Sequence, residues 1–391
     1  MIRHIIKLIW NRKRSLAWIF IEQVLVFLAL FLCFTYSVDI FMKLFSKGNI
    51  KVDNLAVVHY SNYQQEDDIM EESNNTQFRN MLERMKELQI IELVSISNRA
   101  VPVMGSNLID SVDFRENRHR THIKFCDENF HKMFSLKLSE GEWFRDSDVS
   151  EIMPALVTQQ FADDVGLTGS AIGQTVEYNG MTYRITGVVE AFKNRANDNL
   201  LPVLFVPVSM ATNTYRQYVV KYKQGQSSDF TRAFFAEFYR NFPRDQYQPM
   251  LIDFSKINSI ISVLDVTIGL YMTVIPVAFL LIFAFMGTFG VVWMQSKKRM
   301  SELGLRIALG CTPARLQITI VLENLILTTF AMLPGLIVVA NLYAFSPKGW
   351  EWIAAVVAAI VLMWLFAAFS AWYPARQASK VQPVEALRAN Q

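Results

Sequence analysis

The 391-residue sequence lacks the short motifs that carry catalysis in many enzyme families. It contains no G-x-x-x-x-G-K-[ST] phosphate-binding loop and no H-E-x-x-H, G-x-S-x-G or C-x-x-C sequence. We therefore predict a non-catalytic subunit, with no catalytic residue and no cofactor bound by this chain.

Cysteine is scarce, with three residues in the chain. Cys33 lies in an apolar run, Cys126 in a more polar middle stretch, and Cys311 in a short basic segment. No two of them are spaced as a local pair, so we expect no disulfide framework. We expect Cys126 to behave as a small buried hydrophobic residue.

Charge is also sparse. Charged residues make up 19% of the chain, below the quarter or so of an average soluble protein, and the net charge is only +3. That excess is too small to indicate a nucleic-acid partner. By contrast, 52% of the residues are hydrophobic, and they are concentrated in long runs.

One histidine-rich stretch, HRTHIKFCDENFH, is a weak candidate for metal binding. It holds His119, His122, Cys126 and His131. The spacing matches no closed zinc pattern, so surface histidines and a buried cysteine are the expected outcome and no metal site is predicted.

Four apolar runs are long enough to cross a bilayer, which takes roughly 20 helical residues. They cover residues 16–38, 266–294, 318–345 and 352–373. Glu22, Asp265 and Glu323 fall near the ends of these runs, where we expect them to be solvated or to snorkel. Glu323 beside Asn324 is the exception, since the pair could help to fix the third span.

The basic residues predict the orientation. Five Lys or Arg residues precede the first run, five separate the second from the third, three follow the fourth, and one lies between the third and fourth. The positive-inside rule then puts both termini in the cytoplasm, together with residues 295–317 and 374–391, and puts residues 39–262 outside. Residues 1–15 are predicted to form an interfacial helix, and the first run a retained anchor.

The exported stretch shows β-α-β patterns at both ends, over residues 54–97 and 215–254. Together they predict one split β-α-β lobe, about 50–104 with 201–256, and an inserted lobe at about 105–200. Within the insert, residues 174–190 predict a hairpin that turns at Asn179-Gly180. The predicted fold class is an α-helical four-span membrane protein with a large two-lobed α/β extracytoplasmic domain between the first two spans.

The segment RMSELGLRIALGCTPARLQ separates the second run from the third. Arg299, Glu302 and Arg306 are spaced to pair along one helical face. Gly310 permits a left-handed stop and Pro313 a new helix start. The resulting short helix, with Leu303, Ile307 and Leu309 as apolar contacts, could dock into a partner's groove or rest on anionic membrane lipid.

This segment and the tail YPARQASKVQPVEALR resemble two signature segments of the FtsX-like, MacB-type permeases, which are membrane subunits of ABC transporters. The order of one span, a large exported domain and three further spans is similar to that family, and GEWF (141–144), PALVTQQFADD (154–164) and residues 172–192 resemble its MacB-like periplasmic core. The resemblance implies ATPase coupling through Arg299, Glu302, Leu303, Gly304, Arg306, Leu309 and Gly310. It also implies a cytoplasmic tail motif with Pro374, Arg376, Pro383, Glu385, Leu387 and Arg388.

The resemblance further implies a mechanotransmission subunit in a bacterial inner (plasma) membrane. Its expected partners are a separate cytoplasmic ABC ATPase that binds ATP and Mg, a second permease copy, and an extracytoplasmic adaptor or cargo protein. Efflux, lipoprotein release and control of envelope proteins all remain open. A membrane-anchored receptor or scaffold with a ligand-binding exported domain is the alternative.

Overall fold

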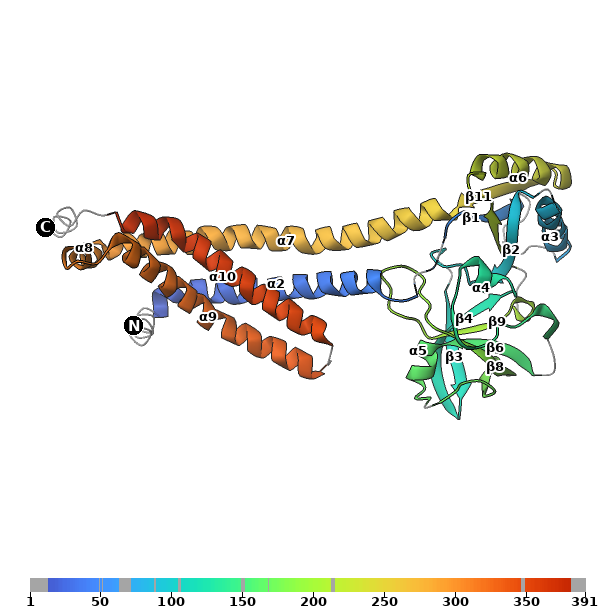
Figure 1. Cartoon of the computed structure of the whole chain (residues 1–391), viewed down its shortest axis with the longest axis horizontal. Coiled ribbons are helices and arrows are strands. Elements are labelled where there is room, and N and C mark those ends of the chain that lie inside the picture. Colours follow the sequence, from blue (N-terminus) through green and yellow to red (C-terminus); the bar gives the residue numbers. More distant parts are fainter. Residues whose placement is uncertain are drawn as a thin grey trace. The chain divides into compact units, whose positions relative to one another are not determined.

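The computed structural model describes residues 13–48, 50, 52–62, 72–87, 89–104, 107–148, 152–167, 169–211, 215–345 and 349–380. The chain divides into two compact units (Figure 1). A membrane unit combines Met1–Met42 with Thr267–Gln391, and an exported unit covers Lys43–Val266. The predicted interfacial helix at residues 1–15 lies almost wholly outside the described residues.

Four long helices have the length and composition to cross a membrane, as the four apolar runs predict. They are α2 (Lys13–Phe45), α7 (Phe254–Lys298), α9 (Pro313–Phe345) and α10 (Trp350–Ala378). Helices α9 and α10 lie against each other (Figure 1), and Asn324 Nδ2 of α9 donates to Ala367 O of α10 at 2.7 Å.

Helix α7 begins at Phe254, well before residue 266, where the second apolar run starts. The carboxylate of Asp253 explains the early start. It accepts from the Ser255 hydroxyl at 2.7 Å and from the Lys256 amide at 3.3 Å, so it caps the helix directly after a strand. A single helix therefore continues from the exported unit into the membrane unit.

Helix α10 also extends beyond its apolar segment, which ends at residue 373. It passes through Pro374 and ends at Ala378, whereas the sequence suggested a tail starting at residue 374. Pro374, Ala375 and Ala378 are all buried. Packing of the two alanines beside Leu303 and Leu316 offsets the hydrogen bond that proline removes.

A short helix, α8 (Met300–Ala308), joins α7 to α9. The predicted stop is confirmed, because Gly310 adopts φ +93°, a left-handed conformation that side chains rarely accept. Helix α9 then begins at Pro313, as predicted, and the Thr312 hydroxyl accepts from the Arg315 amide at 3.4 Å.

The two predicted β-α-β units of the exported unit are present. The first comprises β1 (Leu55–Asn62), α3 (Glu72–Glu87) and β2 (Ile91–Asn98), and the second comprises β10 (Gln217–Tyr222), α6 (Ser227–Asn241) and β11 (Tyr247–Asp253). Their strands lie in the order β11-β1-β10-β2 and all neighbours are antiparallel. Phe78 of α3 and Phe234 and Phe238 of α6 are fully buried against Tyr60 and Tyr218 of the sheet. We call this part the first lobe.

The remaining strands form the second lobe. They are β3 (Leu108–Phe114), β4 (Asn117–Cys126), β5 (Leu138–Gly141), β6 (Met153–Thr158), β7 (Thr175–Tyr178), β8 (Met181–Val189) and β9 (Val203–Pro207), with the short helices α4 (Phe130–Met133) and α5 (Gln159–Asp164). The predicted hairpin is confirmed, since β7 and β8 turn at Asn179 and Gly180 with φ of 53° and 73°. Strand β9 belongs to this lobe as well, because it pairs with β4 and β6. The lobe therefore extends past its expected limit at about residue 200.

The two lobes share one sheet, in which the pairing between them is short, and an apolar cluster that packs Val57 and Val219 of the first lobe with Phe134 and Phe205 of the second. Strand β2 pairs with β4 at only two positions, Ser97 with Cys126 and Asn98 with Phe125. Beside them, the carboxylate of Asp127 accepts from the Ser95 hydroxyl and from the Ile96 amide, each at 2.7 Å. A buried carboxylate thus reinforces a short stretch of backbone pairing.

Lys124 of β4 is buried to 1% exposure in the second lobe. Its ammonium lies 3.5 Å from Ala100 O and 5.1 Å from the centre of the Phe192 ring. Burial lowers the pKa of Lys124 to about 7, since the charged form loses its hydration. The folded domain therefore holds this lysine largely neutral above that pH.

This burial predicts a pH-dependent stability. Between about pH 7 and 10 the unfolded chain binds one more proton than the folded chain, so stability should rise with pH by up to about 1.4 kcal/mol per unit. Calorimetric unfolding of the full chain in detergent, compared with Lys124→Met, measures the slope. A slope that is unchanged in Lys124→Met would contradict the assignment.

Candidate functional site: the helix between the second and third spans

Helix α8 carries a linked set of ion pairs. Glu302 accepts from Arg299 Nε at 3.2 Å and from Arg306 Nη2 at 2.6 Å. This confirms the pairing predicted from their spacing. Arg299 Nη1 also donates to Glu323 on α9 at 2.7 Å. The predicted role of Glu323 in fixing the third span is therefore confirmed, through an arginine that belongs to the preceding junction.

The charges at this site reinforce one another. Burial alone would raise the pKa of Glu302, but hydrogen bonds and charge from Arg299 and Arg306 outweigh it and hold that pKa below its usual value. Burial would lower the pKa of Arg299, whereas Glu323 and Glu302 raise it overall. Glu302 is thus ionised at neutral pH, and Arg299 bridges the two helices as a permanent cation.

The two faces of α8 have different surroundings. Leu303 and Gly304 are buried, and Leu303 belongs to an apolar cluster with Leu316, Ile320, Ala375 and Ala378. Leu305 and Leu309 face outward, 52% and 79% exposed. Of the residues predicted to couple to an ATPase, Leu303 and Gly304 therefore hold α8 against α9 and α10. Leu305, which the sequence reasoning missed, shares the exposed apolar side with Leu309.

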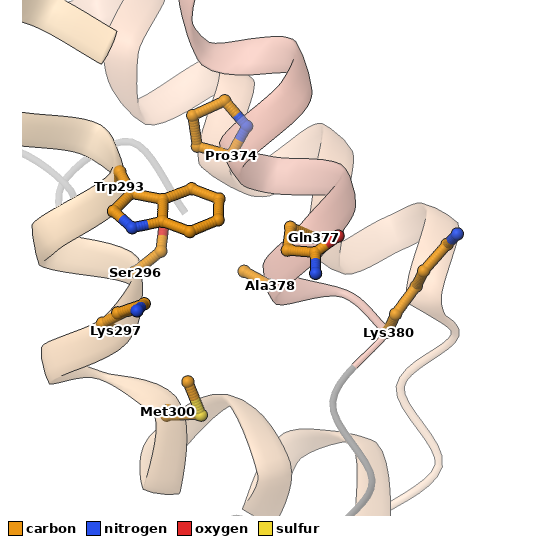
Figure 2. Close-up of a pocket in the computed structure, with 8 residues that line it drawn as sticks. All are labelled: Trp293, Ser296, Lys297, Met300, Pro374, Gln377, Ala378 and Lys380. Carbon is orange, nitrogen blue, oxygen red and sulfur yellow. The ribbon is translucent and has the colours of Figure 1, made fainter. Parts of the chain in front are cut away.

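A cavity of about 340 Å³ opens beside the start of α8. It is lined by Trp293, Ser296, Lys297, Met300, Pro374, Gln377, Ala378 and Lys380. Figure 2 shows the Trp293 ring of α7 and the Gln377 side chain of α10 on opposite sides of this space. Pro374 of the predicted tail motif is therefore part of α10 and of the cavity wall, and Arg376 is exposed on the same last turns. Pro383, Glu385, Leu387 and Arg388 lie outside the described residues.

Glu22 does not snorkel as expected. One of its carboxylate oxygens is buried and has no hydrogen-bond partner among the described residues. Both oxygens lie 2.8 Å from the position that a Cβ on Gly287 would occupy. Gly287 is thus a close-packing position, because only glycine leaves room for this carboxylate. At Gly290, by contrast, no neighbouring segment among the described residues comes within 4 Å of the Cβ position.

Further polar groups are buried in the membrane unit. Gln23 is 1% exposed, and Thr288 and Thr328 are 0% exposed. Within the described part of the chain, neither amide atom of Gln23 and neither threonine hydroxyl has a hydrogen-bond partner. These residues on α2, α7 and α9 were not singled out from the sequence, because an isolated Gln or Thr in an apolar run gives no sign of which way it faces. Each unmet polar atom weakens the packing around it.

The histidine-rich stretch does not assemble a metal site in the described residues. His122 and Cys126 share strand β4, whereas His131 lies on α4 and stacks against Trp143, with ring centres 5.0 Å apart. Cys126 is fully buried in the apolar core, as expected.

The bridge between α8 and α9 predicts the effect of Glu323→Gln. Glutamine keeps the shape but loses the charge, which costs about 1 kcal/mol of local stability for a charged hydrogen bond. Amide exchange over residues 300–308 should accelerate about fivefold, as measured by mass spectrometry in detergent. Glu351→Gln, at the other end of α10, serves as the control, and equal exchange in both variants would contradict the bridge.

The buried amide of Gln23 predicts a substitution that stabilises the protein. Gln23→Leu removes two unmet polar atoms at similar volume, so the free energy of unfolding should increase by about 1–3 kcal/mol. The thermal midpoint of the purified chain should rise accordingly. A matched Gln377→Leu change on an exposed site should leave the midpoint unaltered. A drop in the midpoint of Gln23→Leu would show that its amide is hydrogen-bonded.

Comparison with known proteins places this geometry in a family. Residues 26–233, more than half of the chain, match the MacB-like periplasmic core domain, and residues 274–383 match the FtsX-like permease C-terminal region. Two curated relatives from Bacillus subtilis (strain 168) are uncharacterized ABC transporter permeases. YknZ is 21% identical over 291 residues, covering 70% of this chain and 72% of the relative. YvrN is 21% identical over 296 residues, covering 69% and 72%.

Similar solved structures come from the same group of proteins. The periplasmic region of MacB from Actinobacillus actinomycetemcomitans has a TM-score of 0.39 and 13% identity, covering 54% of this chain and 93% of that one. The extracellular domain of YknZ, described as a noncanonic ABC-type transporter from Gram-positive bacteria, has a TM-score of 0.38 and 16% identity, covering 50% and 100%. The family assignment comes from the two sequence matches and not from these scores. The chain belongs to the ABC transporter permeases that join a MacB-like periplasmic core domain to an FtsX-like permease region.

Proposed function

We propose that this chain transmits motion and does not conduct a substrate between its spans. A separate cytoplasmic ATPase would bind ATP and Mg, grip α8, and displace it as nucleotide binds and is hydrolysed. The displacement would pass along α7 and α2 to the exported unit. The observation that carries this proposal is Arg299, which joins Glu302 on α8 to Glu323 on α9 and makes the docking helix rigid with a span.

The outward face of α8 supports docking of a protein partner. Leu305 and Leu309 present a compact apolar surface, and Arg306 and the exposed Arg315 flank it. A short helix with exposed leucines and flanking cations suits a groove with an apolar floor and acidic rim. The inner face is already occupied by α9 and α10, so a force on the outer face would be passed to the spans instead of being absorbed by bending of a loop.

The proposal extends to partners and place. A second permease copy is expected, because ABC ATPases work in pairs, and each would need a docking helix. The excess of Lys and Arg at both termini and around α8 favours a cytoplasmic position for them, in the bacterial inner (plasma) membrane. Export, lipoprotein release and control of envelope proteins are the activities that motion of the exported unit could serve, through an adaptor or cargo protein outside.

The docking face predicts a separable defect. Leu309→Asp places a charge on the exposed apolar surface without touching the Arg299 network. We expect at least a tenfold loss of the ATPase that co-purifies from native membranes in mild detergent, consistent with the loss of a central interface contact worth about 2 kcal/mol. Quantitative mass spectrometry of the purified complex provides the measurement.

Leu309→Met, which keeps the apolar surface, is the matched control and should retain the ATPase. If Leu309→Asp retains as much ATPase as Leu309→Met, the assignment of α8 as the docking helix is rejected. A chain that co-purifies only with exported proteins, and with no ATPase, would reject the transmission proposal and favour a receptor or scaffold.

A further inference from the structure

We propose that residues 190–198 form a clamp that ties the outer ends of both α2 and α7 to the second lobe, with Lys193 and Arg195 as its positioning residues. The clamp rests on the proposed transmission of motion, and it identifies where that motion enters the exported domain. Every contact that defines it lies within the exported unit.

Lys193 holds the end of α2. Its side chain is nearly fully buried, and its ammonium donates to Lys43 O and to the Ser46 hydroxyl, each at 2.6 Å. The last carbonyls of a helix have no partner in the helix and carry partial negative charge, so a cation that bonds them is favoured. Lys193 therefore caps α2 from a loop about 150 residues later in the chain.

The chain after α2 is packed onto the same loop. Gly48 adopts φ +91°, and the position of a Cβ there is 3.2 Å from Ala191 and 3.3 Å from Lys193. Lys47 forms an ion pair with Glu190 at the start of the loop. Helix α2 is thus held at its last turn and at the residues that leave it.

Arg195 holds α7. Its guanidinium Nη1 lies 2.9 Å from the carboxylate of Asp265, in the part of α7 that belongs to the exported unit. Asp265, which the sequence predicts to be solvated at a span end, has this ion-pair partner instead. The Arg195 amide also donates to Asp198 at 3.0 Å, which fixes the loop locally.

The loop itself is anchored in the second lobe. Phe192 is fully buried and packs edge-on against Phe205 of β9, with ring centres 5.4 Å apart. Asn194 donates to the side chain of Asn107 at 2.9 Å, and the Leu201 amide donates to Phe192 O at 3.0 Å. A force applied to Lys193 or Arg195 is therefore passed to the core of the second lobe.

The clamp adds polar attachments to apolar packing that already joins α7 to the second lobe. Phe254, the first residue of α7, shares an apolar cluster with Phe134 and Phe205, and its ring centre lies 6.1 Å from that of Phe134. That packing holds only the start of α7. Arg195 holds Asp265, about three turns further along the helix, and Lys193 holds the end of α2.

The test is amide exchange of the full permease–ATPase complex, with and without Mg-ATP and vanadate. In the unaltered complex, trapping should change the exchange of both lobes. In Arg195→Asp and in Asp265→Arg, the response of β3 and β4 should fall about threefold, the factor expected for one partly exposed ion pair, while the response of β1 and β11 persists. The double variant, Arg195→Asp with Asp265→Arg, should restore the response of the second lobe.

Arg240→Asp is the control, because it breaks an exposed ion pair within α6 and should leave both responses unchanged. Lys193→Met should reduce the second-lobe response further. A second lobe that responds normally in both single variants, or that is not rescued in the double variant, overturns the clamp while the transmission proposal stands. An exported unit that shows no response in the unaltered complex overturns both.

Discussion

The antiparallel pairing of β1 with β11 is the constraint on which the exported domain depends. Strand β1 follows α2 after a short connection, and β11 runs directly into α7. Their pairing, from Ala56 opposite Asp253 to Asn62 opposite Tyr247, brings the two ends of the 224-residue exported unit together at one edge of the first lobe. Because backbone hydrogen bonds resist sliding by even one residue, the start of β1 is held beside Asp253, the residue that precedes α7.

At the C-terminal end of α7, helix α8 is held rigidly and yet keeps one face exposed. Helix α8 is nine residues long and could not hold its shape alone, since helices of that length are marginal in water. Burial of Leu303 and the Arg299 bridge to Glu323 supply what its length does not. The same arrangement leaves Leu305 and Leu309 uncovered, so the rigid face and the docking face are opposite sides of one helix.

The two lobes of the exported domain have separate apolar cores and also a shared one. One core is rich in phenylalanine under α3 and α6, and another is built from β3, β4 and β6 to β9. A third cluster joins the lobes and packs Val57 and Val219 of the first with Phe134 and Phe205 of the second. Backbone pairing between the lobes is brief, and Asp127 supports it. Lys193 and Arg195 add polar attachments to α2 and α7 beyond this packing.

Local sequence was enough for much of this protein. The four apolar runs, the two β-α-β units, the Asn179-Gly180 hairpin and the Gly310 stop all follow from patterns a few residues long, because length, periodicity and turn chemistry act locally. The pairing of Arg299 with Glu302 and Arg306 is of the same kind, since helical spacing alone brings them together. The resemblance of two short segments supplied the family.

Only the tertiary structure decided what depends on contacts between distant segments. The sequence could not show that Leu303 and Gly304 face inward and Leu305 outward, because α8 is apolar on more than one side. Nor could it show that Pro374 continues a helix, which requires the packing around Ala375. Lys193 and Arg195 sit in a polar loop that looks solvated, and their partners at Lys43 and Asp265 lie roughly 150 and 70 residues away. No local pattern encodes such pairs, because their energy comes from burial and charge that exist only after the chain has folded.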